Sequence, residues 1–415
     1  MNKLTISILL LLVVVLLALG VYVLFRPEQR PVVQADLELS QALGGAGDSG
    51  FARVLGPREF SFPEDHGPHP EYGVEWWYFT GNLDSLDSLD SLDSPNSPDS
   101  PNSPDSREGR HFGFELTLFR IGLASERPQR ASDWAASQLY LGHFAVTDVE
   151  NNRFYAFERF SRDALGLAGA SVTEGQSFRV WLEDWSVEGE GATQPAIRLR
   201  AAEEDVAIEL SLVSAKPLVL PGDRGFSQKS AEAGNASYYY SVTRMPTSGT
   251  ISIGRHSYIV QGNSWMDREW STSALSEGQV GWDWFALQLS DGRDLMYYQI
   301  RHEDGVAGEF SGGMLVFEDG STTPISDDEV SIRVLDTWVS PRGASYPSRW
   351  QLRVPSQSIE LEVQPLVNDQ ELDLSVRYWE GAVKVSGKSG GLPVSGWGYV
   401  EMTGYAEGLR GRSPK

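Results

Sequence analysis

Two clusters of carboxylates set among large aromatic residues are the places in this sequence where chemistry could occur. The first is Glu75–Tyr78 (EWWY), and the second is Asp267–Trp270 (DREW). A carboxyl group in an aromatic pocket can stay protonated near neutral pH and act as an acid. The clusters therefore offer Glu75, Asp267 and Glu269 as candidate catalytic acids. The structural alternatives are a core strand with a salt-bridged Glu75, and a salt-bridged turn at a barrel rim.

The residues around these carboxylates could line an apolar ligand site. Further aromatic residues follow the second cluster in GWDWF (281–285) and MYYQ (296–299), and a lone histidine lies in the apolar run LGHF (141–144). That histidine is either a core residue or a site residue. The candidate ligand-binding residues are Trp76, Trp77, Tyr78, His143, Arg268, Trp270, Trp282, Trp284, Tyr297 and Tyr298.

Several other kinds of site are excluded or unsupported by the sequence. It contains neither G-x-S-x-G nor H-E-x-x-H, which are the motifs of common hydrolases. His66 and His69 have no third ligand motif, so we expect no metal site. The absence of cysteine excludes disulfides, Cys-ligated zinc and thiol catalysis. The net charge of −23 argues against a nucleic-acid partner.

A strand must position the first cluster, because its residues are aromatic and Gly73 and Gly81 flank it. Alternation along that strand predicts one face with Glu75, Trp77 and Phe79, and an opposite face with Trp76, Tyr78 and Thr80. A second aromatic strand is expected at His111–Arg120. Between them lies an Asp/Ser/Pro-rich stretch, 84–106, which is too polar to order itself. The two strands are therefore predicted to form a hairpin with a disordered acidic insert.

Strand-like segments separated by turn residues continue along the rest of the chain, without a long amphipathic helical pattern. A second series of strands begins at Gly249–Ile253. Regularly spaced short strands are typical of antiparallel barrels and sandwiches. We predict an all-β protein with two antiparallel β-barrels side by side, comprising residues 55–245 and 246–407, followed by a tail at 408–415.

The N-terminal segment predicts a membrane anchor. Leu4–Phe25 contains no charged residue and is long enough to span a bilayer as a helix. We assign residues 1–26 to a transmembrane anchor or signal segment and 27–54 to a linker. Nearly the whole chain would then lie on one side of the membrane. We expect a bacterial cell-envelope protein, anchored in the inner membrane and facing the periplasm, or secreted there if the segment is cleaved.

Several motifs together resemble one family. They are Asp65–Tyr78, Ser264–Ser271, Gly281–Phe285, Leu335–Trp338, Tyr346–Trp350, Glu371–Leu374 and Tyr378–Gly381. In this order they resemble the "predicted secreted hydrolase" branch of the carotenoid 1,2-hydratase and AttH-like superfamily. The resemblance extends over nearly all of the predicted folded part.

The resemblance implies two lipocalin-like barrels with a ligand cavity at or near their contact. The family's hydratases add water across a terminal double bond of an acyclic carotenoid, and an Asp-His-x-Trp run with a downstream Tyr and Asp is implicated. Here Arg268 replaces the histidine, and no aspartate accompanies Tyr297 and Tyr298. If the chain is a hydratase, Trp270 and Trp282 would stabilise the carbocation formed when a carboxyl group protonates the alkene.

The leading hypothesis is an extracytoplasmic protein that hydrates a lipophilic, isoprenoid or lipid-like small molecule by carboxyl acid catalysis, without a cofactor. The alternatives are a non-catalytic lipocalin-type carrier, an envelope scaffold without a cavity, and a hydrolase of unidentified mechanism. The expected partners are the lipophilic ligand and, through the N-terminal segment, the membrane. The sequence identifies no envelope or transporter partner.

Overall fold

The computed structural model describes residues 50–88, 109–125, 136–173, 177–272, 275–276, 278–305 and 307–406. The predicted membrane segment, most of the linker and the C-terminal tail lie outside these residues. Within the described part, helix is confined to three short turns, η1 (Glu64–His66), η3 (Asp327–Glu329) and η4 (Pro355–Gln357). None of them has the length and hydropathy needed to cross a bilayer.

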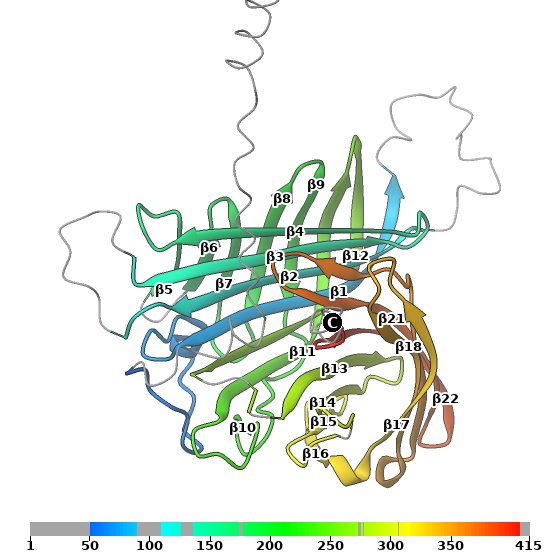
Figure 1. The fold of residues 1–415 in the computed structure, drawn as a ribbon. Coiled ribbons are helices and arrows are strands. Elements are labelled where there is room, and N and C mark those ends of the chain that lie inside the picture. The colour runs from blue at the N-terminus through cyan, green and yellow to red at the C-terminus, as the bar shows by residue number, and fades with distance from the viewer. Residues whose placement is uncertain are drawn as a thin grey trace, which may run out of the picture. The chain divides into compact units, whose positions relative to one another are not determined.

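The described strands form two antiparallel sheets (Figure 1). The first sheet contains β1 (Val74–Ser88), β2 (His111–Gly122), β3 (Gln138–Asp148), β4 (Arg153–Arg162), β5 (Ala168–Thr173), β6 (Ser177–Leu182), β7 (Trp185–Glu190), β8 (Ala196–Glu203), β9 (Val206–Val213), β10 (Phe226–Gln228), β11 (Ala236–Ile253) and β12 (His256–Ser271). Its strand order is β4-β3-β2-β1-β12-β11-β9-β8-β7-β6-β5, and β10 pairs with β11.

The second sheet is smaller. It contains β13 (Gln279–Leu289), β14 (Asp294–His302), β15 (Gly312–Val316), β16 (Thr322–Ser326), β17 (Ser331–Val339), β18 (Ser345–Val354), β19 (Ile359–Pro365), β20 (Glu371–Asp373), β21 (Arg377–Ser389) and β22 (Leu392–Met402). Its order is β16-β15-β14-β13-β22-β21-β19-β18-β17, and β20 pairs with β21. The prediction of an all-β fold with two antiparallel barrel-like sheets is confirmed.

Each sheet curls around its own apolar core. Trp77 and Phe79 of β1 lie in the core of the first sheet, with Trp185 and Trp270. A separate cluster containing Trp350 fills the second sheet. Because side chains alternate along a strand, the residues between these core positions point away from the core of their own sheet. The two faces predicted for the opening strand are therefore confirmed.

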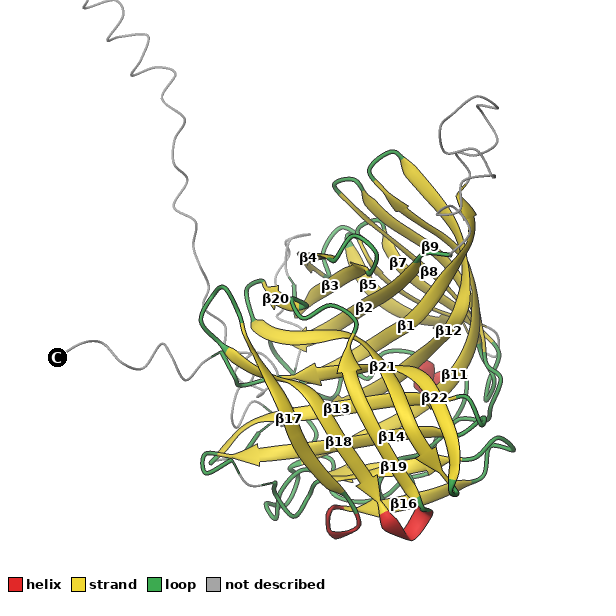
Figure 2. Ribbon diagram, turned by 90° about the vertical axis from the view of Figure 1, so that its right-hand side faces the viewer, coloured by secondary structure: helices red, strands yellow, loops and turns green. Residues whose placement is uncertain are grey.

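The two sheets pack against each other through those second faces. Figures 1 and 2 show β1, β11 and β12 of the first sheet beside β13, β21 and β22 of the second. Gly113 on β2 permits the close approach, because a Cβ atom there would lie 2.6 Å from the Cβ of Ala382 on β21. The Asn82 amide donates a hydrogen bond to the Gly398 carbonyl across the contact, at 3.0 Å.

The chain changes from the first sheet to the second later than the predicted division between residues 245 and 246. That division falls inside β11, a continuous strand, and both β11 and β12 belong to the first sheet. The second sheet starts only at Gln279. Strand spacing is equally regular on both sides of the predicted division, so the sequence pattern contained no signal for the change of sheet.

The predicted hairpin is confirmed, and β1 pairs with β2 from Val74 opposite Ile121 to Asp84 opposite His111. β1 continues to Ser88, where it still pairs with β12. The first residues assigned to the acidic insert, Asp84–Ser88, are therefore part of the strand. Residues 89–108, which contain the rest of the predicted insert, lie outside the described residues.

Candidate functional site

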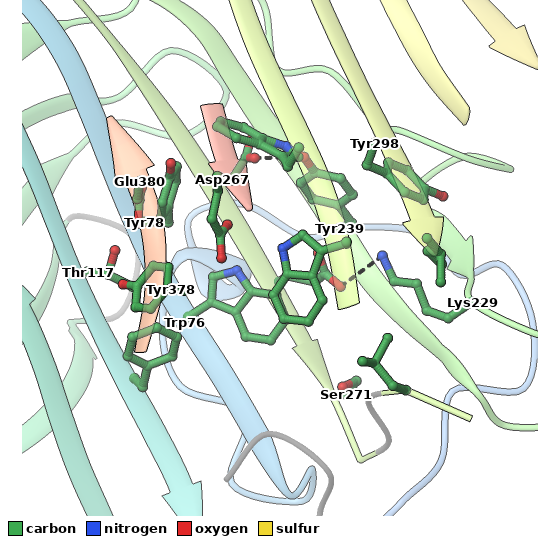
Figure 3. A pocket seen from close by; sticks show the side chains of 17 residues that line it. Trp76, Tyr78, Thr117, Lys229, Tyr239, Asp267, Ser271, Tyr298, Tyr378 and Glu380 are labelled. Carbon is green, nitrogen blue, oxygen red and sulfur yellow. Dashed lines mark hydrogen bonds and ion pairs between the residues drawn. The ribbon is translucent and has the colours of Figure 1, made fainter. Parts of the chain in front are cut away.

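A pocket lies where the two sheets face each other, with about 1040 Å³ of space that is partly open to solvent. Its walls combine aromatic rings with carboxyl groups (Figure 3). The lining residues are Trp76, Tyr78, Thr117, Phe119, Lys229, Tyr239, Asp267, Glu269, Ser271, Leu275, Trp282, Trp284, Tyr298, Ile300, Tyr378, Glu380 and Glu401. The aromatic lining with a few polar groups has the character of a site for an apolar small molecule.

Strand alternation selects which residues of the two predicted clusters reach the pocket. Trp76 and Tyr78 point into it from β1, and Asp267 and Glu269 point into it from β12. The register places Tyr78 opposite Asp267 and Trp76 opposite Glu269 on the paired strand. The aromatic and acidic side chains of the two clusters thus form one continuous wall. The alternative of a salt-bridged turn for the second cluster is wrong, because these residues lie within a strand.

The second sheet contributes two glutamates that directly face each other. Glu380 of β21 is the register partner of Glu401 of β22, and Glu115 of β2 lies close enough to influence both. Like charges opposite each other on paired strands repel, so these carboxyl groups do not all ionise easily. Glu380 is 2% exposed, and its Oε1 has no hydrogen-bond partner among the described residues.

The protonation of these glutamates follows from that environment. Burial, reinforced by the neighbouring carboxyl groups of Glu115 and Glu401, raises the pKa of Glu380 well above its usual value. Burial also raises the pKa of Glu401 to about 8, although the Trp282 side chain opposes the shift. The environment of Glu380 therefore favours the protonated, neutral acid, and this group faces an aromatic-lined cavity.

Asp267 has a different environment. Its carboxylate accepts hydrogen bonds from the Tyr239 hydroxyl at 2.7 Å, the Ser241 hydroxyl at 2.5 Å and the Trp265 indole nitrogen at 2.8 Å. Burial raises the pKa of Asp267 to about 6, which is below the value of about 8 for Glu401, because these donors favour the ionised carboxylate of Asp267. One pocket thus holds a protonated carboxyl group and an ionised carboxylate, the combination used for acid and base work.

Lys229 and Glu269 form an ion pair at another part of the pocket wall. The Lys229 ammonium lies 3.2 Å from Glu269 Oε1 and 4.8 Å from the centre of the Tyr298 ring. Burial alone would lower the lysine pKa, but Glu269, Tyr298 and Asp267 together outweigh burial and raise the pKa. Lys229 is therefore a charged ammonium. Figure 3 shows Lys229 and Tyr298 across the pocket from Glu380, Tyr78 and Tyr378.

Glu75 lies outside the pocket, although it was a predicted acid. It is fully buried between Arg120 and Arg268, both of which donate hydrogen bonds to its carboxylate, and it accepts the backbone N–H of His69 at 3.0 Å. Burial opposes its ionisation, but the two arginines outweigh burial and hold the pKa of Glu75 well below its usual range. Glu75 therefore ties strands of the first sheet together, as the structural alternative for its cluster proposed.

Four other predicted ligand-binding residues point into the core of a sheet. Trp77 and Trp270 lie in the core of the first sheet, where the Arg268 guanidinium stacks 3.9 Å from the centre of the Trp77 ring. Tyr297 lies in the core of the second sheet. Trp270 stacks on His69 with ring centres 3.8 Å apart, so it does not face a bound ligand.

His143 is buried behind the pocket wall. Its Nδ1 lies 2.7 Å from the hydroxyl of Tyr378, which lines the pocket, and its Nε2 lies 3.2 Å from Glu158. The histidine therefore supports a pocket residue without itself lining the pocket. In the described part of the chain, no group of three or more histidines and carboxylates is placed to hold a metal ion.

Several pocket residues were not among the predicted ones. The most important are Glu380, Glu401, Tyr239, Lys229 and Tyr378. A signal existed for Tyr378 and Glu380, because the run 378–381 (YWEG) places a carboxylate beside aromatic residues, as Glu75–Tyr78 does. Nothing in their sequence neighbourhoods marks Lys229 or Glu401, which reach the pocket only through the pairing of distant strands.

Two antiparallel barrel-like sheets with a pocket between them define a lipocalin-like class of protein. The AttH-like family model matches residues 104–405, and the chain belongs to this family. The predicted family membership is confirmed. An AttH protein from Nitrosomonas europaea is 32% identical, with a TM-score of 0.70, and the match covers 86% of this chain and 100% of that one.

Two further solved structures share the fold at lower identity. Kievitone hydratase from Nectria haematococca is 14% identical with a TM-score of 0.58, covering 87% of this chain and 95% of that one. CghA in complex with Sch210972 is 13% identical with a TM-score of 0.51, and the match covers 86% of this chain and 97% of that one. At these identities the likeness concerns the fold alone. A comparison with curated proteins finds no match.

The raised pKa of Glu401 predicts a pH-dependent stability. A glutamate with a usual pKa of 4.5 and a folded pKa of about 8 binds more protons in the folded state, so the free energy of unfolding falls as pH rises between these values. His66, whose pKa burial lowers to about 4, gives the opposite slope below about pH 6.5. We therefore expect urea denaturation to show stability falling from pH 6.5 to 8.

The matched variant for this prediction is Glu401→Gln, which removes the titrating group and keeps its shape. We expect the loss of stability between pH 6.5 and 8 to be smaller in this variant than in the parent protein. Equal slopes in the two proteins would show that Glu401 is ionised over this range and that its environment does not favour the neutral form.

Proposed function

We propose that the pocket between the two sheets binds a lipophilic small molecule and adds water across one of its carbon–carbon double bonds. The observation that carries the proposal is Glu380, a buried and protonated acid in an aromatic-lined cavity that also holds an ionised carboxylate, Asp267. Membership of the AttH-like family and the fold shared with a kievitone hydratase support hydration as the reaction.

The chemistry follows from the positions of these groups. Glu380 gives its carboxyl proton to one alkene carbon, which forms a C–H bond and leaves a carbocation on the other carbon. The ring faces of Trp76, Trp282 and Trp284 stabilise that cation. A water oxygen then bonds to the cation, and Asp267 accepts the proton that the water loses. The product is an alcohol, and the proton returns from Asp267 to Glu380 through solvent in the open pocket.

A carrier of lipophilic ligands is the alternative that uses the same pocket. A carrier needs the aromatic walls, but it has no use for carboxyl groups whose pKa values are pushed apart. Burying such groups costs stability, so their presence in the wall favours an enzyme over a carrier.

The experiment is incubation of the purified protein with a panel of isoprenoid and aryl alkenes in water enriched in ¹⁸O. We expect mass spectrometry to detect a labelled alcohol from at least one apolar alkene. The co-purified material is extracted with organic solvent and analysed in parallel. A protein that retains an apolar ligand but never forms labelled alcohol would be a carrier, and an empty, inactive protein would contradict both functions.

Fewer observations support the proposed substrate class and the proposed cellular location. The family resemblance favours an isoprenoid or lipid-like substrate, and the apolar segment 4–25 favours action in the bacterial envelope, with the sheets in the periplasm. Protease treatment of spheroplasts tests the location. We expect the protein to be digested in intact spheroplasts, whereas full protection would place it in the cytoplasm.

A further inference from the structure

The pocket is lined by more carboxyl groups than cationic side chains. Four carboxyl groups line it, from Asp267, Glu269, Glu380 and Glu401, and within the described residues Lys229 is the only cationic side chain that does so. Lys229 is paired with Glu269. The remaining carboxyl groups therefore face the pocket without a positive partner of their own there.

Lys229 shows what kind of group these walls accept. Its ammonium lies 3.2 Å from the Glu269 carboxylate and donates a hydrogen bond to the Ser227 hydroxyl at 3.0 Å. Two aromatic rings also contact it, with the centres of Tyr298 and Tyr239 at 4.8 and 5.7 Å. A carboxylate combined with ring faces is the usual environment of an organic ammonium ion. The protein thus binds one of its own cations in this pocket.

The wall across the pocket from Lys229 offers the same chemistry without a resident cation. Glu380 and Glu401 lie there beside Trp282 and Trp284. Tyr78 packs edge-on against Trp284, with ring centres 5.2 Å apart and planes at 83°, and so fixes the orientation of that ring. The buried Glu380 Oε1 meets no hydrogen-bond partner among the described residues, and the nearby Tyr78 and Tyr378 side chains act to lower the pKa of this carboxyl group.

We propose that this wall binds an organic cation: an alkyl- or arylammonium group carried on an apolar body, with its charge at Glu380 and its substituents against Trp282 and Trp284. The inference rests on the proposed function of the same pocket, since an ammonium ion resembles the carbocation of the hydration reaction. A cation beside Glu380 favours the ionised carboxylate, so binding releases a proton from the protein.

The test compares phenyltrimethylammonium with its neutral isostere, tert-butylbenzene. Both are titrated into the full-length protein at pH 8, with tryptophan fluorescence as the readout, because three tryptophans line the pocket. We expect the ammonium to bind at least tenfold more tightly than the hydrocarbon, and its binding to acidify a weakly buffered solution. Equal affinity, or preference for the hydrocarbon, would overturn the cation site while leaving an apolar pocket for the proposed function.

Single-residue variants test which carboxyl group causes the preference for the ammonium and the proton release. Glu380→Gln is expected to abolish the preference for the ammonium and the proton release while retaining affinity for tert-butylbenzene, with circular dichroism to establish folding. If this variant is unfolded, Glu401→Gln serves instead and is expected to reduce the preference. Glu362→Gln, on the exposed side of β19, is the matched control and should change neither affinity. Failure of both probes to bind would contradict the cation site and the proposed pocket together.

Discussion

Replacing Glu380 by glutamine is expected to lower the rate of alkene hydration by a factor of about 10² to 10⁴, the usual contribution of a general acid. The amide keeps the size of the side chain but has no acidic proton to donate. Because the surroundings of Glu380 favour its neutral form, we expect the substitution to leave the charge of the empty pocket nearly unchanged. We therefore expect the affinity for a neutral alkene to remain within a few-fold, so the loss appears in kcat rather than KM.

Two comparisons make this result specific. Glu362→Gln removes a carboxylate from the exposed face of β19 and should leave the rate unchanged. Asp267→Asn should also reduce the rate, because it removes the proposed base and leaves its three hydrogen-bond donors without a carboxylate. A Glu380→Gln protein that hydrates the alkene at the parent rate would show that the proton comes from another group.

Replacing Arg268 by methionine is expected to lower the free energy of unfolding by about 3–5 kcal/mol, the usual cost of removing one partner of a buried ion pair. Arg268 and Glu75 are both fully buried, so Glu75 would keep only Arg120 as a cationic partner. The guanidinium also stacks on Trp77, and that contact is lost as well. Urea denaturation at pH 7 measures the change.

The control for this variant is Arg349→Met. Arg349 forms an ion pair with Glu362 at 2.7 Å, but both side chains are substantially exposed, and such pairs contribute less than about 1 kcal/mol. If Arg268→Met were no more destabilising than Arg349→Met, the cluster around Glu75 would not stabilise the first sheet, and a functional role for Glu75 would have to be reconsidered.

The sequence predicted the strands and the two faces of β1, because aromatic composition and alternation are local properties. It did not reveal which face meets a ligand, since both faces are apolar: Trp77 fills the core of a sheet and Trp76 lines the pocket. The function of each carboxylate depends on distant partners. Glu75 is neutralised by Arg120 from β2 and Arg268 from β12, pairings that strand register decides.

The function of Glu380 likewise depends on distant partners that its local sequence does not reveal. Its sequence neighbourhood resembles that of Glu75, yet the register sets it opposite Glu401 and close to Glu115, and no arginine lines its pocket. Two carboxylates in similar aromatic runs thus become an ionised structural anion and a protonated acid. Strand pairing across the chain decides between these outcomes, and the sequence pattern near either residue does not.

The most direct test of the proposed site is a crystal structure of the protein with a bound apolar ligand, either the co-purified molecule or phenyltrimethylammonium. The pocket between the sheets predicts ligand density against Trp76, Trp282 and Trp284, within hydrogen-bonding or ion-pairing distance of Glu380 for a polar or charged group. Density inside the core of either sheet, or at the surface away from Glu380, would contradict the site and the chemistry assigned to it.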